Sequence, residues 1–278
     1  MNPNVAIIIS NYNYGEYVLE AIDSALNQTY QNIRVYVLDD GSSDDSWEKI
    51  SSITEPEGFR RPLKHQALNT TFDLTTEEMG TPYYAGPIER RNKSNLYAYK
   101  INNSGASTAR NVAMWEAWEW ADIFGILDAD DVYKSQKVEV LTQKLMEHPE
   151  IGVAYADYET HRTYGHTNYI KHEYKLPYDK RLLENQCIVH SGALIKKECL
   201  QYAILKSGEI FDSNLHGPAS QGFIGCTEDY DLWLRLSNVC MIVHVPEPLS
   251  IVRETGQNQS MKMTSEIFQH NVASIRSR

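Results

Sequence analysis

The sequence has no long hydrophobic run and little positive charge. No stretch approaches the roughly eighteen consecutive apolar residues that cross a bilayer, and residues 1–4 lack the basic start of a signal peptide. Lys and Arg number 26 against 37 Asp and Glu, a formal net charge of −11. Such an acidic chain is a poor partner for nucleic acids or anionic membranes. We therefore predict a cytoplasmic protein, free or held peripherally at a membrane, with no nucleic-acid partner and no transmembrane segment.

Cysteine is scarce, and its spacing does not suggest a metal site. The sequence has Cys187, Cys199, Cys226 and Cys240, and no two of them form a closely spaced pair. We predict reduced, buried thiols that pack as small hydrophobic residues. Internal repeats and low-complexity segments are also missing. The 278 residues are therefore predicted to form one α/β domain with a substantial core.

Apolar runs alternate with a helical pattern at the start of the chain. Residues 5–9 and 33–38 are nearly continuous apolar runs, typical of strands buried in a parallel sheet. Apolar residues recur at helical spacing over residues 16–29, and a second helix follows the second run. The order strand, helix, strand, helix is a βαβ unit. Ligands of such sheets bind beyond the carboxyl ends of the strands.

Two acidic turns fall at those strand ends. The first is residues 39–45, and the second contains Asp128, Asp130 and Asp131, directly after an apolar run. Clustered carboxylates repel one another unless a bound cation absorbs their charge. Carboxylate oxygens suit Mg²⁺ or Mn²⁺, which fill their other positions with water and substrate phosphates. From the residues alone, an acidic turn that only caps the next helix is the alternative.

The segment 56–95 interrupts the α/β pattern. It separates a helix near residues 47–53 from a strand at 96–101, and it is far longer than the usual connection in an α/β unit. It carries several arginines and lysines together with Tyr83 and Tyr84. A solvated surface excursion with a small hairpin is one interpretation, because charged loops are usually solvated. A lid or an acceptor-binding insertion is the other.

Five motifs stand out along the chain. They are IIISNYNYGEYVLEAIDSALNQTY, LDDGSSDDS, NNSGASTARN, ILDADD and TEDYDLWLRL. Their order and approximate spacing resemble those of the family 2 glycosyltransferases, and the resemblance covers residues 5–55 and 96–250. The resemblance implies inverting transfer of a sugar from a nucleoside-diphosphate sugar to a hydroxyl group. The acceptor would be a carbohydrate or a glycoconjugate, in polysaccharide or glycoconjugate synthesis.

The same resemblance implies a GT-A type fold. We expect a single α/β domain with a mixed, mostly parallel sheet and flanking helices. A Rossmann-like nucleotide-binding half over residues 1–131, with the insertion 56–95, would precede an acceptor half over residues 132–250. Residues 251–278 would form a closing loop and a C-terminal tail.

The resemblance assigns the nucleotide pocket to residues at the first strand ends. Asp40 matches the position that accepts the N3–H of uracil, and Asp39 is the less favoured alternative. A carboxylate there rejects cytosine, which has no hydrogen at N3, but guanine also offers an N–H, so UDP is favoured without being required. Tyr12 matches an aromatic residue that packs on the base, with a core tyrosine as the alternative. Ser10 would line the same pocket.

The second acidic turn would hold the metal and the ribose. Asp130 matches a ligand of Mn²⁺ or Mg²⁺, and Asp128 would bind the ribose or support the metal. Arg110 matches an arginine near the nucleotide, which either pairs with the diphosphate or orients an acidic residue. Thr255 stands where a histidine of the family often reaches the metal or diphosphate, so the third metal contact is left open.

The acceptor side is assigned to the motif at residues 227–236. Asp229 matches the catalytic base, which takes the proton of the acceptor hydroxyl as that oxygen attacks the anomeric carbon. A charged first turn that satisfies the helix dipole is the alternative. Glu228 would lie beside the acceptor or brace the base, and Asp231 would be structural. His190 follows an apolar strand and is expected to be a weak acceptor contact or a satisfied strand-end histidine.

Two other functions fit parts of the pattern. A nucleotidyltransferase also uses paired acidic residues on an α/β sheet, but it usually needs a basic, Gly-rich loop near the N-terminus, and SNYNYGEY is not one. A catalytically silent nucleotide-sugar-binding module is the second alternative. The presence of both Asp130 and Asp229 argues against it.

Overall fold

A computed structural model describes residues 2–60, 84, 88–164, 167–215, 227–255 and 265–276. Its strands are β1 (Val5–Asn11), β2 (Ile33–Asp39), β3 (Glu55–Arg60), β4 (Ile88–Lys93), β5 (Leu96–Lys100), β6 (Ile123–Asp128), β7 (Val132–Tyr133), β8 (Ile151–Tyr164), β9 (Thr167–Glu173), β10 (Leu194–Lys196) and β11 (Met241–Glu254). Its helices are α1 (Val18–Leu26), α2 (Ser46–Ser52), α3 (Ala106–Ala117), α4 (Lys137–Met146), α5 (Lys180–Leu183), α6 (Lys197–Ala203), α7 (Glu228–Leu236) and α8 (Ser265–Arg276).

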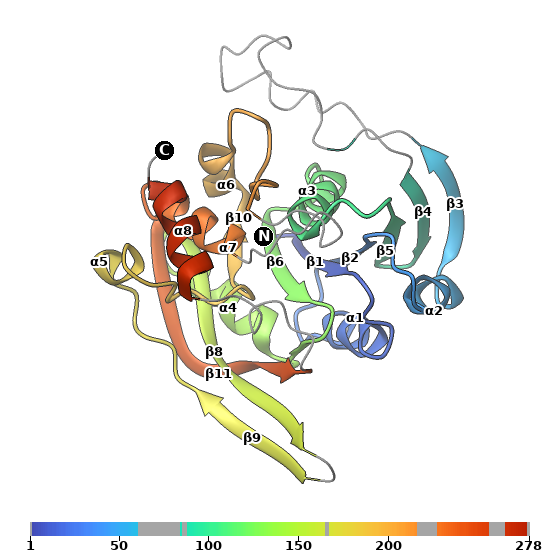
Figure 1. The fold of residues 1–278 in the computed structure, drawn as a ribbon, viewed down its shortest axis with the longest axis horizontal. Coiled ribbons are helices and arrows are strands. Elements are labelled where there is room, and N and C mark those ends of the chain that lie inside the picture. Colours follow the sequence, from blue (N-terminus) through green and yellow to red (C-terminus); the bar gives the residue numbers. More distant parts are fainter. Residues whose placement is uncertain are drawn as a thin grey trace.

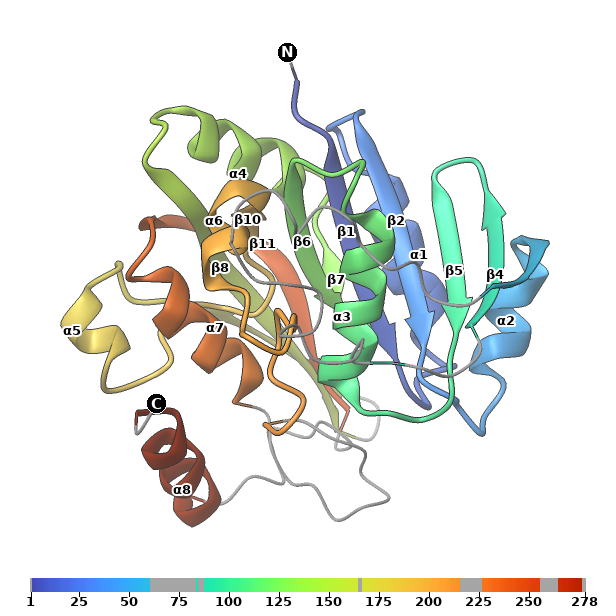
Figure 2. The same ribbon diagram turned by 90° about the horizontal axis from the view of Figure 1, so that it is seen from above.

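The described strands form one mixed sheet of eleven strands, with helices on both faces (Figures 1 and 2). The order is β3-β4-β5-β2-β1-β6-β10-β8-β11-β7, and β9 pairs with β8. Strands β5, β2, β1 and β6 are parallel, whereas β10 is antiparallel to both of its neighbours. The predicted α/β architecture with a mixed sheet is confirmed.

The parallel centre brings the two acidic turns to one edge of the sheet. In β1, Ser10 pairs with Leu38 of β2 on one side and with Asp128 of β6 on the other. The next residue, Asn11, pairs with Asp39. The carboxyl ends of all three strands therefore lie side by side at one edge of the sheet, where ligands of such sheets bind.

Each face of the sheet has its own hydrophobic core. In β1, Ala6 and Ile8 pack into a cluster with residues of α3, α6, α7 and α8. The alternate residues Ile7 and Ile9 pack into a second cluster with α1, α2 and α4. Figure 2 shows these two helical layers on opposite sides of the strands. The alternation follows from the two-residue period of a strand, and it explains why the run is continuously apolar.

Two helices are shorter than their apolar patterns suggest. The predicted helix over residues 16–29 is α1, which ends at Leu26; the next residue, Asn27, donates to Asp23 O from both its backbone N and its side-chain Nδ2, each at 3.0 Å. The helix expected to continue to Trp120 is α3, which ends at Ala117. Beyond it, Trp120 is held by Arg34, whose guanidinium carbon lies 4.3 Å from the ring centroid.

The predicted insertion 56–95 contributes two strands to the sheet. Strands β3 and β4 pair antiparallel, and β4 pairs antiparallel with β5, so the sheet is extended beyond its parallel centre. The Tyr84 hydroxyl accepts a hydrogen bond from Asn102 N at 3.1 Å. Residues 61–83 and 85–87, including Tyr83, lie outside the described residues. A role of this segment in acceptor binding stays a prediction.

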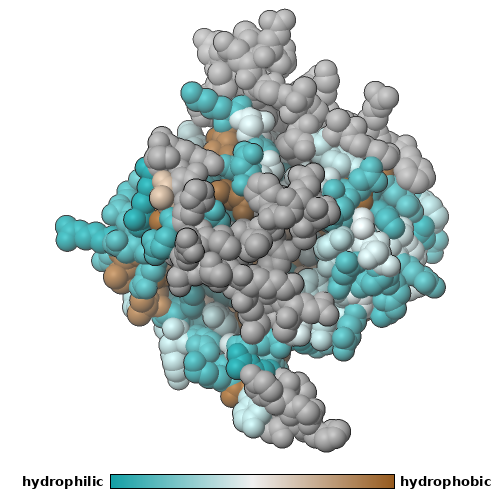
Figure 3. Space-filling view, viewed as in Figure 1, coloured by the Kyte–Doolittle hydropathy of each residue, from teal (hydrophilic) through white to brown (hydrophobic). Residues whose placement is uncertain are grey.

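No helix in the ranges given above is long and apolar enough to cross a bilayer. On the face shown in Figure 3, the described residues are mostly hydrophilic, with small hydrophobic areas among them.

Candidate active site

The first acidic turn is built around Asp39. Asn11 Nδ2 donates to Asp39 Oδ2 at 2.8 Å, and Ser42 N donates to Asp39 Oδ1 at 3.0 Å. Asn11 and Asp39 are both buried. The Asp39 side chain therefore links the ends of β1 and β2. Of the two neighbouring aspartates, Asp40 is the one that contacts the loop before α3.

Asp40 holds the turn that begins α3. Its Oδ1 accepts Ser104 N at 2.7 Å and its Oδ2 accepts Gly105 N at 2.8 Å, while the side chain is 3% exposed. An anion at this position also favours the helix N-terminus electrostatically. Gly41 allows the backbone at Asn103 to pass close to the turn that carries Asp40. Its φ is +70°, and a Cβ at this position would lie 2.7 Å from Asn103 N. A uracil N3–H would therefore share an oxygen that already accepts a backbone amide.

Ser10 and Tyr12 lie at the carboxyl end of β1, between the two acidic turns. Both are half-buried, and the register of β1 places Ser10 beside Asp128. A half-buried tyrosine at this edge is compatible with a ring that packs on a base, and the alternative of a core tyrosine is not met at Tyr12. Its contact with a base stays a prediction.

The second acidic turn is fixed from two directions. Asp131 N donates to Asp128 O at 3.0 Å, which closes a tight turn after β6. The Tyr14 hydroxyl hydrogen-bonds Asp130. From β11, Arg253 N donates to Asp131 Oδ1 at 3.0 Å and Arg253 Nη1 donates to Asp130 O at 2.9 Å. The turn does not cap a helix, because α4 begins at Lys137 with Gln136 as its N-cap.

Burial and mutual repulsion raise the pKa values of this turn. Burial, followed by the charge of Asp128, raises the pKa of Asp130 to about 7. Burial and the charges of Asp130 and Asp128 raise the pKa of Asp131 well above its usual range. When ionised, these buried carboxylates carry more negative charge than the groups around them neutralise, which is the electrostatic setting in which a divalent cation binds.

A buried lysine lies behind the turn. Lys137 is 1% exposed, its Nζ donates to Ser250 Oγ at 2.5 Å, and it lies 3.9 Å from the ring centroid of Tyr133. Burial lowers its pKa to about 7, against the opposing effect of Asp131 and Asp128. Lys137 was not among the residues predicted from the sequence, because a lysine at the start of a helix has no pattern that distinguishes it from an exposed one.

The donor set of the acidic turn fits a hard divalent cation. In the part of the chain that the structure describes, no group of three or more His, Cys, Asp or Glu side chains is arranged to hold a metal ion. Asp128 and Asp130 would therefore supply at most two ligands, with the rest from water and a diphosphate. Mg²⁺ and Mn²⁺ are commonly bound in this way.

Arg110 ties three elements together. From α3, its Nη2 donates to Asp128 Oδ1 of β6 at 2.8 Å, and its Nη1 donates to Glu228 Oε1 of α7 at 2.5 Å. Arg110 is 6% exposed and Glu228 1% exposed. The guanidinium carbon also lies 5.5 Å from the Phe211 ring centroid. Arg110 was expected either to pair with the diphosphate or to orient an acidic residue. In the structure it contacts acidic side chains, as the second role requires.

Asp229 begins α7 next to this network. It is half-buried, and burial, followed by the charge of Glu228, raises its pKa to about 7, while Arg110 lowers it. Asp231 is buried and accepts from Arg235 Nε at 2.9 Å, which agrees with the expected structural role. Asp229 thus combines access with a pKa suited to proton transfer near neutral pH.

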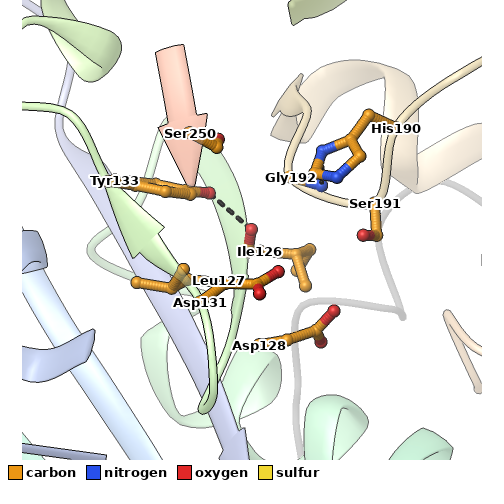
Figure 4. Close-up of a pocket in the computed structure, with 9 residues that line it drawn as sticks. All are labelled: Ile126, Leu127, Asp128, Asp131, Tyr133, His190, Ser191, Gly192 and Ser250. Atoms are coloured by element: carbon orange, nitrogen blue, oxygen red, sulfur yellow. Dashed lines mark hydrogen bonds between the residues drawn. The ribbon is translucent and has the colours of Figure 1, made fainter. Parts of the chain in front are cut away.

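His190 lies across a small pocket from Asp128 and Asp131 (Figure 4). The turn that carries it precedes β10, so the expectation that it follows a strand was wrong. Its Nδ1 accepts Gly192 N at 3.0 Å, and burial together with nearby lysines holds its pKa well below the usual range. It is a neutral, hydrogen-bonded histidine. The pocket is lined by Ile126, Leu127, Asp128, Asp131, Tyr133, His190, Ser191, Gly192 and Ser250.

Comparison with known sequences points to one family. The family model described as "Glycosyl transferase family 2" matches residues 6–79 and 76–202. An uncharacterized glycosyltransferase of Nostoc sp. is 28% identical over 149 residues, which are 54% of this chain and 35% of that protein. The glycosyltransferase GlyG of Streptococcus pneumoniae is 26% identical over 147 residues, 53% of this chain and 36% of that protein. These matched regions span about a third of each relative's length.

Solved structures share the fold. TarS 1-349 of S. aureus in complex with UDP has a TM-score of 0.61 at 15% identity, covering 98% of this chain and 64% of that one. The mannosyltransferase PcManGT from Pyrobaculum calidifontis, in complex with GDP-Man and Mn²⁺, has a TM-score of 0.53 at 17% identity, covering 91% and 57%. At these identities the likeness is one of fold, and it confirms the expected GT-A type architecture.

Proposed function

Since this chain belongs to glycosyl transferase family 2, we propose that it transfers a sugar, with inversion at the anomeric carbon, from a nucleoside-diphosphate sugar to a hydroxyl group. The acceptor would be a carbohydrate or a glycoconjugate. The observation that supports the proposal is that Asp128, which is held by Arg110, lies close enough to both Asp130 and Asp229 to raise their pKa values. A cytoplasmic location, free or peripheral to a membrane, stays a prediction.

A UDP-sugar is the favoured donor. TarS binds UDP and UDP-GlcNAc, and PcManGT binds GDP-Man, so the shared fold accommodates nucleoside-diphosphate sugars. The carboxylate of Asp40 at the end of β2 suits a base with an exposed N–H, as in uracil. Tyr12 and Ser10 would complete that pocket at the end of β1.

Asp130, with support from Asp128, would hold Mn²⁺ or Mg²⁺ together with the diphosphate. Such a cation neutralises charge on a departing diphosphate. Arg110 of α3 donates to Asp128 at 2.8 Å, and this hydrogen bond would keep Asp128 oriented toward the ribose and the metal. Tyr14 and Arg253 hold the remainder of the turn against movement.

Asp229 would act as the general base. In its ionised form it accepts the proton of the acceptor hydroxyl while that oxygen attacks the anomeric carbon, opposite the bond to the diphosphate that breaks. Glu228, held by Arg110, would brace this first turn of α7. His190, across the pocket from Asp128, would contact the acceptor only weakly.

Thermal unfolding with UDP tests the donor and metal assignments together. UDP should stabilise the protein more with Mn²⁺ than with EDTA, because a bridging cation adds affinity for the folded state, and Asp130→Ala should remove the difference. Glu48→Gln, an exposed carboxylate on α2, is the matched control and should keep it. Equal stabilisation by UDP in EDTA would contradict the metal assignment.

A panel of UDP- and GDP-sugars separates the enzyme from the alternatives. Released nucleoside diphosphate, with or without added saccharide acceptors, is expected for a glycosyltransferase. Release of pyrophosphate from nucleoside triphosphates would instead indicate nucleotidyl transfer. Metal-dependent binding of a nucleotide sugar without any hydrolysis or transfer would support the silent binding module.

A further inference from the structure

Two thiols meet away from the active site. Cys199 lies on α6 and is 8% exposed, and Cys240 follows α7 just before β11 and is half-buried. The two side chains interact with each other, and Cys240 Sγ donates to Leu236 O at 3.6 Å. The expectation that all the cysteines are buried was wrong for Cys187, which is exposed, and Cys226 lies outside the described residues.

Gly152 makes room for the pair. A Cβ built at Gly152 of β8 would lie 2.3 Å from Cys199 Sγ and 2.4 Å from Cys240 Sγ. Both sulfurs therefore converge on the volume that a side chain at this position would fill. Only glycine leaves that volume empty, so the strand beneath the pair permits the contact between the thiols.

We propose that Cys199 and Cys240 are a redox-active dithiol that a small peroxide converts to a disulfide. The Cys199 thiol ionises, and its thiolate attacks one oxygen of the peroxide and breaks the O–O bond; the sulfenic acid forms, and the departing hydroxide takes up the thiol's proton to leave as water. Cys240 sulfur then attacks the Cys199 sulfur and expels a second water. One hydrogen peroxide thus oxidises two thiols to one disulfide and two waters.

The local chemistry sets the order of these steps. Contact with the Cys240 thiol, which itself donates to Leu236 O at 3.6 Å, lowers the pKa of the Cys199 thiol, and the same contact raises the pKa of Cys240. The thiolate is the nucleophilic form, so Cys199 reacts first and Cys240 resolves the sulfenic acid. The limited exposure of Cys199 restricts the oxidant to a small molecule. In a reducing compartment such a disulfide is transient, as redox-sensing disulfides are.

The disulfide would close a loop that contains α7 and Asp229. Cys199 precedes the loop and Cys240 ends it, directly after the helix whose first turn carries the proposed base. Cross-linking restricts the unfolded chain, so the oxidised protein should unfold at a higher temperature than the reduced one. This modification is independent of the proposed sugar transfer.

Peptide mapping of the wild-type protein after treatment with hydrogen peroxide is the direct test. We expect a cross-linked species joining the Cys199 and Cys240 peptides, a loss of two titratable thiols, and recovery of both with dithiothreitol. Cys187→Ser should not change the cross-link, whereas Cys199→Ser should abolish it. In Cys240→Ser, Cys199 should accumulate as higher oxides, because no resolving thiol remains.

Gly152→Ala gives a second, independent variant. The added Cβ should force the sulfurs apart and reduce the yield of the disulfide. If this variant does not fold, the wild-type mapping still decides. Peroxide that leaves both thiols titratable, oxidises them singly without a cross-link, or joins either of them to Cys187 or Cys226 would overturn the proposal.

Discussion

Arg110 donates to Asp128 Oδ1 at 2.8 Å, and this hydrogen bond fixes the end of β6 to helix α3. The same guanidinium reaches Glu228, so the metal side and the base side of the proposed site share one buried cation. A change at Arg110 should therefore affect both sides at once.

Arg110→Met should lower the free energy of unfolding by about 3 to 5 kcal/mol, because it leaves buried carboxylates without their partner. Urea unfolding measures the loss. Metal-dependent binding of UDP should weaken as well, since Asp128 loses its orientation. Arg90→Met is the matched control, because Arg90 pairs with Glu116 at 2.5 Å in a similarly buried pair on β4 and α3. It should cost stability but keep UDP binding, and loss of UDP binding in both variants would indicate a general effect of instability.

Asp130 should make the metal-free protein less stable as the pH rises. Its pKa is about 7 in the folded protein and about 4 in an unfolded chain. Between these values the folded state binds more protons, so the contribution of this group to stability falls as the pH rises through that window and stays low above it. The full shift corresponds to about 4 kcal/mol as an upper limit.

Asp130→Asn tests this sign. In EDTA, the variant should be more stable than the wild type at about pH 8, where the wild-type carboxylate is ionised, and the advantage should shrink toward about pH 4. Urea unfolding over this range measures it, and Glu48→Gln is the control for loss of a carboxylate alone. A variant that is less stable than the wild type throughout would show that the charge on Asp130 is already neutralised.

Local patterns in the sequence predict the centre of the fold well. The continuous apolar runs around Ile8, Val35 and Ile126 correspond to parallel strands buried on both faces, because side chains on each face meet a helical layer. The acidic turns then fall at one edge, since parallel strands end together. Asp128 raises the pKa values of both Asp130 and Asp229, so the three carboxylates lie near one another, and the roles that the resemblance gives them stay predictions.

Contacts between distant residues were not predictable in the same way. The Lys137 side chain lies against Ser250 of β11 and beside Gly192 in the turn before β10, and the sequence around Lys137 gives no indication of either contact. The bond from Arg253 to Asp131 joins residues of β11 and the acidic turn. Asp40 holds a helix that begins far along the chain. Helix caps are recognisable in sequence when the capping residue is adjacent, which Asp40 is not.

Asp40→Asn should affect both the fold and the nucleotide. The amide has one oxygen in place of two, so it loses at least one of the bonds to Ser104 N and Gly105 N, and stability should fall by about 1 to 3 kcal/mol. UDP affinity, measured by calorimetry on the folded variant, should weaken by a similar amount if the same carboxylate also accepts the uracil N–H. Unchanged affinity together with lowered stability would restrict Asp40 to holding α3.

Asp229→Asn should separate donor binding from sugar transfer. The proposed base takes a proton from the acceptor and makes no contact that the donor needs, so metal-dependent UDP binding should persist. Transfer should fall by about 10² to 10⁴, the usual contribution of a positioned base. In the wild type, the rate should rise with pH up to the pKa of about 7 and then level off, because burial and Glu228 delay ionisation of the carboxylate.

The neighbouring acidic residues make this test specific. Asp231→Asn changes a carboxylate in the same turn of α7 that is engaged by Arg235, so it should lower stability while the folded fraction keeps its transfer rate. Transfer is best measured at saturating donor and acceptor, where changes in binding do not contribute. Near-normal turnover in Asp229→Asn, with the pH profile unchanged, would refute the assignment. Glu228, the preceding residue, would then be the next candidate for the base, although its carboxylate accepts a hydrogen bond from Arg110.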